Sequence, residues 1–183
     1  MNIVDEIFAL FECRGDREYF GETVSQRDHA LQVAHFAVQD RAKGPLIVAS
    51  LLHDIGHLLT GEEGMAERGF DGCHENSGNA WLRQYFSPAV TEPVRMHVAA
   101  KRYLCYAEPD YLRGLSDASI LSLKLQGGMF NEREATNFLA QPYAHDAVRL
   151  RRWDDRGKIL GLEVAPIESY RELLTCHSRS IEL

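Results

Sequence analysis

The sequence predicts an all-α fold, a single helical bundle, from two observations. Apolar residues recur every three or four positions along much of the chain, which is the spacing of a helix that buries one face. No segment alternates apolar and polar residues convincingly, as a half-buried strand would. Because 183 residues are enough to bury one core, we expect residues 1–183 to form one domain without internal repeats or linkers.

The N-terminal part of the chain is predicted to form two helices. Apolar residues at helical spacing over residues 3–11 indicate an amphipathic helix that ends near Gly15–Asp16. A non-periodic segment, residues 18–22, follows it. Ser25, with Asp28 three residues later, resembles a capping box and so begins a second helix. One face of that helix is expected to carry His29, Val33 and Phe36.

The central segment, residues 49–59 (ASLLHDIGHLL), places His53, Asp54 and His57 in an otherwise apolar helix. Gly44–Pro45 separates it from the preceding helix, with the proline suited to a first helical turn. In one continuous helix, His53 and His57 would share a face, and Asp54 would lie about 100° round from His53. Because burying unpaired polar groups is costly, we interpret these side chains as a functional group. The alternative is a buried polar helix whose histidines are satisfied by hydrogen bonds.

The remaining helices are predicted between breaks that contain glycine or proline. Residues 60–73 include four glycines and are interpreted as a surface loop. Gly127–Gly128 ends one helix, and Pro166 introduces the last. The helices predicted in this part of the chain span residues 74–86, 87–108, 116–125, 132–139, 143–154 and 167–177.

Charge and composition limit the functions to be considered. The net charge of −7 argues against non-specific binding to nucleic acid or anionic membranes, although a small anionic substrate remains compatible with a locally positive pocket. No apolar run reaches the length of a membrane span, and the N-terminus is acidic where a signal peptide is basic. The four cysteines form no C-x-x-C pair, which argues against a zinc cluster or a disulfide framework. We therefore expect a cytoplasmic protein that acts on a small molecule.

Six histidine and aspartate residues are candidate metal ligands, and they lie on or at the ends of different predicted helices. In chain order they are His29, His53, Asp54, His74, His97 and Asp154. Helical bundles build metal sites from side chains that project inward from several helices. Imidazole and carboxylate donors without thiolate suit iron, manganese or a similar divalent metal. Six ligands suggest two ions, with Asp54 as the bridge because a carboxylate has two oxygens.

The ordered pattern H…HD…H…H…D resembles the binuclear subgroup of the HD-domain superfamily. The His-Asp doublet that gives the superfamily its name is residues 53 and 54 in this chain. The resemblance implies one HD domain over residues 1–183, in which Asp54 bridges two metals. The remaining ligands divide into one group of His29, His53 and Asp154 and a second group of His74 and His97.

Within that subgroup, the chain resembles the mixed-valent di-iron oxygenases, and among these the phosphonate-degrading dioxygenases. The resemblance covers nearly the whole chain and implies two iron ions, Fe(II) and Fe(III), with dioxygen as co-substrate. The segments that carry it, in the same order as in the family, are residues 19–22 (YFGE), 53–57 (HDIGH), 97–104 (HVAAKRYL), 115–119 (LSDAS), 126–128 (QGG) and 151–154 (RRWD).

The reaction implied by the resemblance is oxidative cleavage of a carbon–phosphorus bond in a 1-hydroxyphosphonate. We expect (R)-1-hydroxy-2-(trimethylammonio)ethylphosphonate as substrate and glycine betaine and phosphate as products, because residues 60–73 and 104–111 depart from the amine-specific pattern. The alternative is 2-amino-1-hydroxyethylphosphonate, which would give glycine and phosphate.

The resemblance also implies which side chains contact this substrate. The residues expected around the phosphonate, as cationic and hydroxyl donors to its oxygens, are His57, Lys101, Ser119 and Arg151. Tyr19 and Glu22 are expected to form a lid, in which Tyr19 occupies a metal in the empty site and Glu22 faces the substrate ammonium. The expected catalytic residues are Tyr19, Glu22, His57 and Lys101.

A quaternary ammonium has no N–H, so Glu22 could act on it only as a counter-charge, with aromatic rings completing a cage. The candidate rings are Tyr19, Phe20, Tyr103 and Tyr106. Aromatic residues at such positions also serve as core.

Two other classes of protein share this ligand pattern. A metal-dependent HD-domain phosphohydrolase would use every ligand without needing dioxygen. A catalytically silent HD module would bind a ligand or partner, but such modules usually lose ligands, and here the set is complete.

Overall fold

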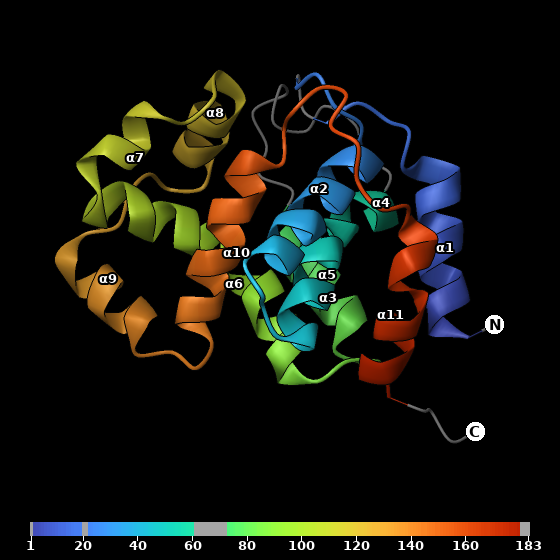
Figure 1. Cartoon of the computed structure of the whole chain (residues 1–183). Helices are drawn as coiled ribbons and strands as arrows, with labels where there is room; N and C mark the ends of the chain where they lie inside the picture. Colours follow the sequence, from blue (N-terminus) through green and yellow to red (C-terminus); the bar gives the residue numbers. More distant parts are fainter. Residues whose placement is uncertain (1, 20–21, 61–72, 180–183) are drawn as a thin grey trace.

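The fold is a bundle of helices, as predicted (Figure 1). The computed structural model describes residues 2–19, 22–60 and 73–179. Within these ranges there is no strand, and the only β contacts are isolated bridges between Glu18 and Ser25 and between Phe86 and Ser178. Residues 61–72 of the predicted surface loop, and the cage candidate Phe20, lie outside the described residues.

The first two helices begin and end near the predicted residues. Helix α1 (Ile3–Arg14) is followed by Gly15, whose N–H donates to a carbonyl of the last turn. Helix α2 (Gln26–Gln39) is capped by Ser25, whose hydroxyl accepts from the Asp28 N–H at 3.0 Å. This cap satisfies an N–H that would otherwise have no partner and fixes the phase of the helix that carries His29.

The prediction of one continuous helix through residues 49–59 is wrong. Helix α3 (Gly44–Leu52) ends before the His-Asp doublet, and a separate helix α4 (Ile55–Thr60) follows. The N–H of His57 donates to the carbonyl of Asp54, only three residues back, at 3.0 Å. This tighter turn redirects the chain, so His53 and His57 do not share the face of one helix.

Helices α5 and α6 carry the next two candidate ligands. Helix α5 (His74–Leu82) ends four residues before the predicted boundary at residue 86. Helix α6 (Pro88–Ala107) begins with proline in its first turn, as expected, and ends two residues before Pro109.

The C-terminal part adds short helices around α6. A one-turn helix, α7 (Pro109–Arg113), was not predicted because five residues are too few for a periodic pattern. The predicted helix after Pro166 begins as a 3₁₀ turn, η1 (Ile167–Tyr170). It continues as α11 (Arg171–His177), which ends at the predicted residue. The other helices agree with the prediction within two residues at each end, and they are α8 (Asp117–Leu125), α9 (Glu132–Leu139) and α10 (Ala144–Arg156).

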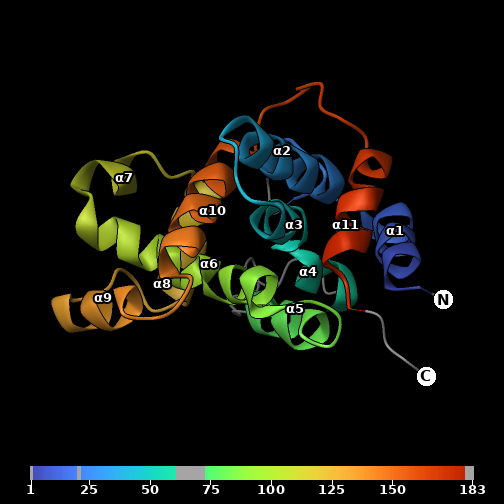
Figure 2. The same ribbon diagram turned by 60° about the horizontal axis from the view of Figure 1, so that its bottom comes forward.

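The helices are arranged around α6 and α10, which pack against each other and against α3 (Figure 2). Helices α1 and α11 lie side by side at one end of the molecule, and α7, α8 and α9 lie at the other (Figures 1 and 2). The larger apolar cluster joins α1, α2, α3, α10 and α11, whereas a smaller one fills the space between α6, α9 and α10. Both clusters include residues of α10, so this helix, which carries Asp154, packs into both.

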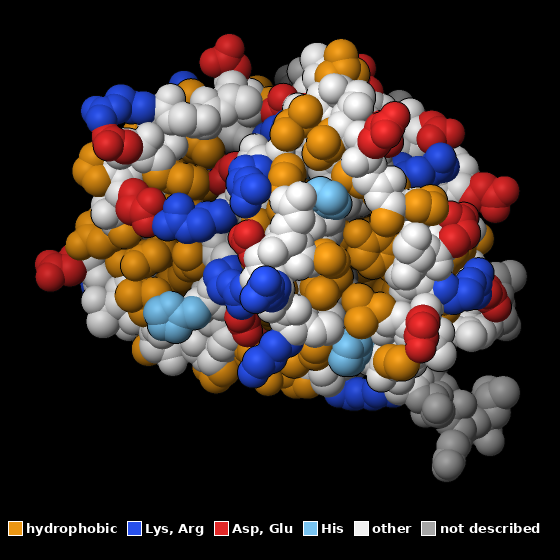
Figure 3. Space-filling view, viewed as in Figure 1, with side chains coloured by type: hydrophobic (Ala, Val, Ile, Leu, Met, Phe, Trp, Pro, Cys, Tyr) orange, Lys and Arg blue, Asp and Glu red, His pale blue; other side chains and the backbone are white. Residues whose placement is uncertain are grey.

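Charges of both signs cover the surface. Lys and Arg side chains gather over α10 in the middle of the face shown in Figure 3. The outward residues of that helix, Arg149, Arg152 and Arg156, are exposed, whereas Arg151 is buried. Among the helices of the described residues, none combines the length and apolar character needed to cross a membrane.

Gly56 is the point of closest approach between α4 and α5. A Cβ at this position would lie 2.0 Å from the carbonyl oxygen of His74. The contact is with backbone, so we expect Gly56→Ala to push α5 away and to lower the free energy of unfolding by about 1–3 kcal/mol. Urea unfolding measures this loss. Gly114→Ala is the matched control, because its Cβ would have no neighbour closer than 3.6 Å, and it should change stability by less than about 0.5 kcal/mol. Equal stability of the two variants would contradict the packing described.

Candidate metal centre

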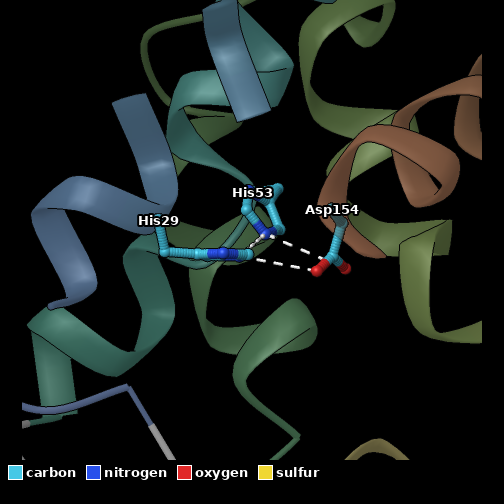
Figure 4. A group of neighbouring side chains, drawn as sticks. All are labelled: His29, His53 and Asp154. Carbon is cyan, nitrogen blue, oxygen red and sulfur yellow. Dashed lines mark hydrogen bonds and ion pairs between the residues drawn. The ribbon is translucent and has the colours of Figure 1, made fainter. Parts of the chain in front are cut away.

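The first ligand group is formed by His29 on α2, His53 at the end of α3 and Asp154 on α10 (Figure 4). The Nε2 atoms of the two histidines lie 3.1 Å apart. Asp154 faces both rings, with Oδ1 at 3.4 Å from Nε2 of His29 and Oδ2 at 4.0 Å from Nε2 of His53. All three side chains are buried. Three helices therefore bring three potential ligand atoms to one point.

The second ligand group is formed by His74, the first residue of α5, and His97 on α6. Their Nε2 atoms are also 3.1 Å apart. The ring of His57 stacks on that of His74, with centroids 3.9 Å apart. Asp54, His57 and His74 also offer atoms within 4.8 Å of one another, so His57 is a further candidate ligand in this group.

Asp54 lies between the two groups. Its Oδ2 is 3.3 Å from Nε2 of His53 and 3.7 Å from Nε2 of His29. Its Oδ1 is 3.2 Å from Nε2 of His74 and 3.4 Å from Nε2 of His97. Each carboxylate oxygen thus faces a different pair of histidines, which is the arrangement that a bridging ligand requires. The turn between α3 and α4 makes this possible, because it frees Asp54 from a regular helix position.

The second ring nitrogen of three of these histidines is fixed by a backbone carbonyl. The Nδ1 distances to carbonyl oxygens are 2.8 Å from His29 to Gly157, 2.9 Å from His53 to Ser50 and 2.7 Å from His97 to Val94. A carbonyl oxygen only accepts, so each Nδ1 carries the proton, and in the neutral ring Nε2 presents its lone pair. This is the orientation in which histidine binds a metal.

The same assignment shows that the residues fit a cation. Lone pairs on His29 and His53 face each other at 3.1 Å and cannot form a hydrogen bond without a proton or ion between them. Asp154 Oδ1 is buried and accepts no hydrogen bond from the described residues. Buried polar atoms of this kind are costly unless a partner satisfies them. A metal ion between the rings and the carboxylate would satisfy all three side chains.

The electrostatics of the centre favour positive charge. Burial tends to lower the pKa of His53, but the carboxylates of Asp54 and Asp154 outweigh burial and raise it to about 9. Burial tends to raise the pKa of Asp54, yet His53 and the hydrogen bonds from its neighbours hold it well below its ordinary value. In the metal-free chain a proton on His53 therefore takes the place of a cation.

Tyr19 covers the first ligand group. Its ring stacks on that of His29, with centroids 3.9 Å apart and an interplanar angle of 17°. The side chain is buried, and its hydroxyl interacts with the carboxylate of Asp54. Burial and the two aspartates raise the pKa of Tyr19 well above its ordinary value, so the hydroxyl is protonated in the metal-free chain. Tyr19 therefore lies against His29 and Asp54, and its role as a lid stays a prediction.

Two of the residues expected to bind the phosphonate, Lys101 and Ser119, are buried and connected through Ser122. Lys101 is buried on α6, one turn after His97, and its ammonium donates to the Ser122 hydroxyl at 2.8 Å. Ser122 in turn donates to the carbonyl of Ser119, which is itself buried. Burial, followed by repulsion from Arg151, lowers the pKa of Lys101 to about 7. Buried cations that repel each other provide a local site for an anion on an acidic protein.

Arg151 is the more constrained of these cations. Its guanidinium donates to Oδ2 of Asp154 at 2.7 Å, to Asp155 and to the Tyr111 hydroxyl at 3.2 Å. Tyr111 also donates to Asp155, so the three side chains form one network. Arg152 points outward and pairs with Glu108 at the surface. Of the two adjacent arginines, Arg151 therefore lies against the candidate ligand Asp154, whereas Arg152 lies at the surface.

His57 contributes an uncharged ring to this region. Burial and the neighbouring His74 ring lower its pKa well below the ordinary value. It is therefore neutral at pH 7 and can act as a hydrogen-bond donor or as a ligand, but not as a cation.

Two of the aromatic cage candidates lie elsewhere. Tyr103 packs on Phe138 in the smaller apolar cluster, with ring centroids 5.3 Å apart. Tyr106 is 41% exposed. Of the described candidates, only Tyr19 lies beside the ligands, so the expectation of a cage that includes Tyr103 or Tyr106 is wrong.

The sequence analysis missed Lys158, Tyr111 and Asp155. Lys158 follows Asp154 by four residues, a spacing that places side chains on one side of a helix. Helix α10 ends at Arg156, however, so helical spacing from Asp154 does not place Lys158. Tyr111 lies on the one-turn helix α7 and meets Arg151 only in the folded chain.

No protein-family model matches the chain. Among curated proteins, a hydroxymethylphosphonate dioxygenase of Gimesia maris is 43% identical over 96% of this chain and 90% of its own length. The glycine-betaine-forming [1-hydroxy-2-(trimethylamino)ethyl]phosphonate dioxygenase of Leisingera caerulea is 44% identical over 88% of this chain and 83% of its own. An uncharacterized mimivirus protein, L432, is 32% identical over 93% of this chain and 80% of its own length.

Proposed function

Because the chain belongs to the family of phosphonate dioxygenases, we propose that it cleaves the carbon–phosphorus bond of a 1-hydroxyphosphonate with dioxygen. The proposed substrate is (R)-1-hydroxy-2-(trimethylammonio)ethylphosphonate, and the products are glycine betaine and phosphate. The observation that carries this function is that buried Arg151 pairs with the candidate ligand Asp154 at 2.7 Å, while buried Lys101 lies one turn after His97 on α6. An anion site next to a metal centre is what a phosphonate oxidation needs.

The proposed metal is a pair of iron ions. His29, His53 and Asp154 would hold one, His74 and His97 the other, and Asp54 both. Bound iron would supply the redox chemistry through which dioxygen reacts with the substrate. Nitrogen and oxygen donors without thiolate suit this metal.

The side chains of this protein would bind and orient the phosphonate. Lys101 and Arg151 would neutralise its oxygens, while Ser119 and neutral His57 would donate hydrogen bonds to it. Arg151 can do so because Asp154, Asp155 and Tyr111 use only part of its five donors and fix the plane of the guanidinium. Tyr19 would close the centre against water, and Glu22 would provide a negative charge near the substrate tail.

The proposed reaction balances without water. The hydroxyphosphonate loses its C–H and C–P bonds, and the carbon leaves as a carboxylate. Phosphorus leaves as phosphate, one proton is released, and the two atoms of dioxygen supply the additional oxygens. Dioxygen is reduced by the four electrons that the substrate gives up.

A second substrate, hydroxymethylphosphonate, is favoured by one observation. Glu22, the proposed counter-charge for a cationic tail, already pairs with the ammonium of Lys158 at 3.0 Å. A substrate without a cation would leave that ion pair undisturbed. The third candidate substrate is 2-amino-1-hydroxyethylphosphonate, which would give glycine and phosphate.

The test of the proposed function is a substrate series with iron-loaded protein. Phosphate release and dioxygen consumption are measured for the trimethylammonio, amino and hydroxymethyl compounds, in air and under argon. We expect one phosphate per dioxygen consumed, with the trimethylammonio compound turned over best and no release under argon. Release that proceeds equally under argon would mean that the chain is a phosphohydrolase.

The pH dependence of substrate binding should reflect Lys101, whose pKa burial and Arg151 lower to about 7. Below that pH the free protein carries the charged ammonium that binds the phosphonate, and above it the ammonium is lost. We therefore expect KM to rise by up to about tenfold for each pH unit above 7. Lys101→Arg stays charged throughout, so its KM should rise less over pH 7–9. Parallel profiles for both proteins would exclude Lys101 as the titrating group.

A further inference from the structure

Lys158 is the second residue after the end of α10. Its ammonium contacts three residues that the proposed function uses. It lies 3.0 Å from Oε1 of Glu22 and 3.1 Å from the hydroxyl of Ser119. It also lies 5.7 Å from the centroid of the Tyr19 ring. Lys158 thus stands between the proposed phosphonate end of the site, at Ser119, and the proposed tail end, at Glu22.

One oxygen of the Glu22 carboxylate, Oε1, accepts from two partners in this arrangement. Ser116 donates to the same oxygen, Oε1, at 2.6 Å. Only about one-sixth of either charged side chain is exposed, at 16% for Glu22 and 14% for Lys158. Burial tends to raise the pKa of Glu22, but the hydrogen bonds from Ser116 and Lys158 hold it below its ordinary value, so the carboxylate is ionised at neutral pH. An ammonium therefore already occupies the place that the cationic tail of a substrate would take.

The backbone on both sides of Lys158 is held without its side chain. Gln32 accepts from the N–H of Ile159 at 2.9 Å and donates to its carbonyl at 2.8 Å. The carbonyl of Gly157 accepts from Nδ1 of His29 at 2.8 Å. A Cβ on Gly157 would lie 2.6 Å from Val33, so the close approach of this backbone to α2 requires glycine. The position of Lys158 relative to the ligands is therefore set by main-chain contacts, and its ammonium is not needed to hold the segment.

We propose that Lys158 determines substrate specificity by competing with cationic substrate tails for Glu22. This inference rests on the proposed function. A trimethylammonio tail has to displace the Lys158 ammonium, because two cations cannot share one partly buried carboxylate without repulsion. Hydroxymethylphosphonate, which has no tail, leaves the pair intact and gains the positive charge beside its phosphonate. Relative to a site with Glu22 alone, Lys158 therefore shifts selectivity towards hydroxymethylphosphonate, and its removal shifts selectivity towards the trimethylammonio compound.

Anaerobic binding to the metal-loaded protein tests this proposal. Titration calorimetry gives Kd for the trimethylammonio compound and for hydroxymethylphosphonate, and the ratio of the two is compared between variants. Lys158→Met frees Glu22, so the ratio should shift by about tenfold or more towards the trimethylammonio compound. Glu22→Gln leaves Lys158 without its counter-ion, so the ratio should move in the opposite direction. Lys158→Arg keeps the charge and should stay close to the wild-type ratio.

These outcomes separate a specificity role from a structural one. A structural role would weaken both ligands together in each variant. A ratio within about twofold of wild type in Lys158→Met would overturn the proposal, as would failure of both compounds to bind any of the proteins. If the ratio shifts as expected but no variant releases phosphate in air, the proposed oxidation fails and the role of Lys158 in ligand selection stands.

Discussion

Replacing Asp54 with asparagine is expected to abolish turnover and to reduce bound metal from two ions to at most one per chain. The two carboxylate oxygens face different histidine pairs, at 3.3 Å from His53 and 3.2 Å from His74. An amide offers one neutral oxygen and places N–H groups where the second metal would bind, so it cannot bridge. We expect a loss of about 10³-fold or more in kcat/KM, which corresponds to at least about 4 kcal/mol of transition-state stabilisation.

Metal analysis and steady-state kinetics of the Asp54→Asn protein measure these losses. The matched control is Asp28→Asn, which changes an exposed carboxylate next to the ligand His29 and should retain both metals and activity. A fully metallated, active Asp54→Asn protein would show that Asp54 is not the bridge. The comparison requires that each variant is folded, and circular dichroism shows whether its helical content is intact.

Arg151→Met is expected to cause the largest loss of stability among substitutions outside the ligand set. The guanidinium is buried, with 6% of its side chain exposed, and it balances Asp154 and Asp155. Removing one partner of a buried ion pair leaves an uncompensated charge, which typically costs about 3–5 kcal/mol. The same change removes a donor to the phosphonate and the contact that orients Asp154, so KM should rise and metal affinity should fall.

The neighbouring residue provides the control for Arg151. Arg152→Met removes a charge from the same turn of α10, but its side chain is 46% exposed and pairs with Glu108 at the surface. Such pairs contribute about 0–1 kcal/mol, so stability and KM should hardly change. Urea unfolding of the metal-free proteins separates the two effects. Equal stabilities for the two variants would mean that the buried network around Arg151 contributes little.

The sequence was sufficient to predict which helices carry the candidate ligands. Caps and breakers such as Ser25, Gly15 and Pro88 act locally, so the bounds of α1, α2 and α6 could be predicted from neighbouring residues alone. The six ligand residues could be grouped because their order follows a family pattern. The folded chain does bring the six side chains together, although their distances could not be inferred from the sequence.

What could not be predicted depends on contacts between distant parts of the chain. The close approach of Gly56, just after the break between α3 and α4, to the backbone of α5 is a contact that no local pattern of residues 49–59 reveals. The pairing of Lys158 with Glu22 joins residues that are far apart in the sequence. Tyr111 reaches Arg151 from a helix too short to have a periodic signal.

The most direct test of the central claim is the fate of isotopically labelled dioxygen. Iron-loaded protein is given the trimethylammonio hydroxyphosphonate under ¹⁸O₂ in ordinary water, and the products are analysed by mass spectrometry. An oxygenase is expected to place label from dioxygen in the products in step with phosphate release. Unlabelled products, formed at the same rate without dioxygen, would contradict the account and identify the chain as a hydrolase that uses the same ligands.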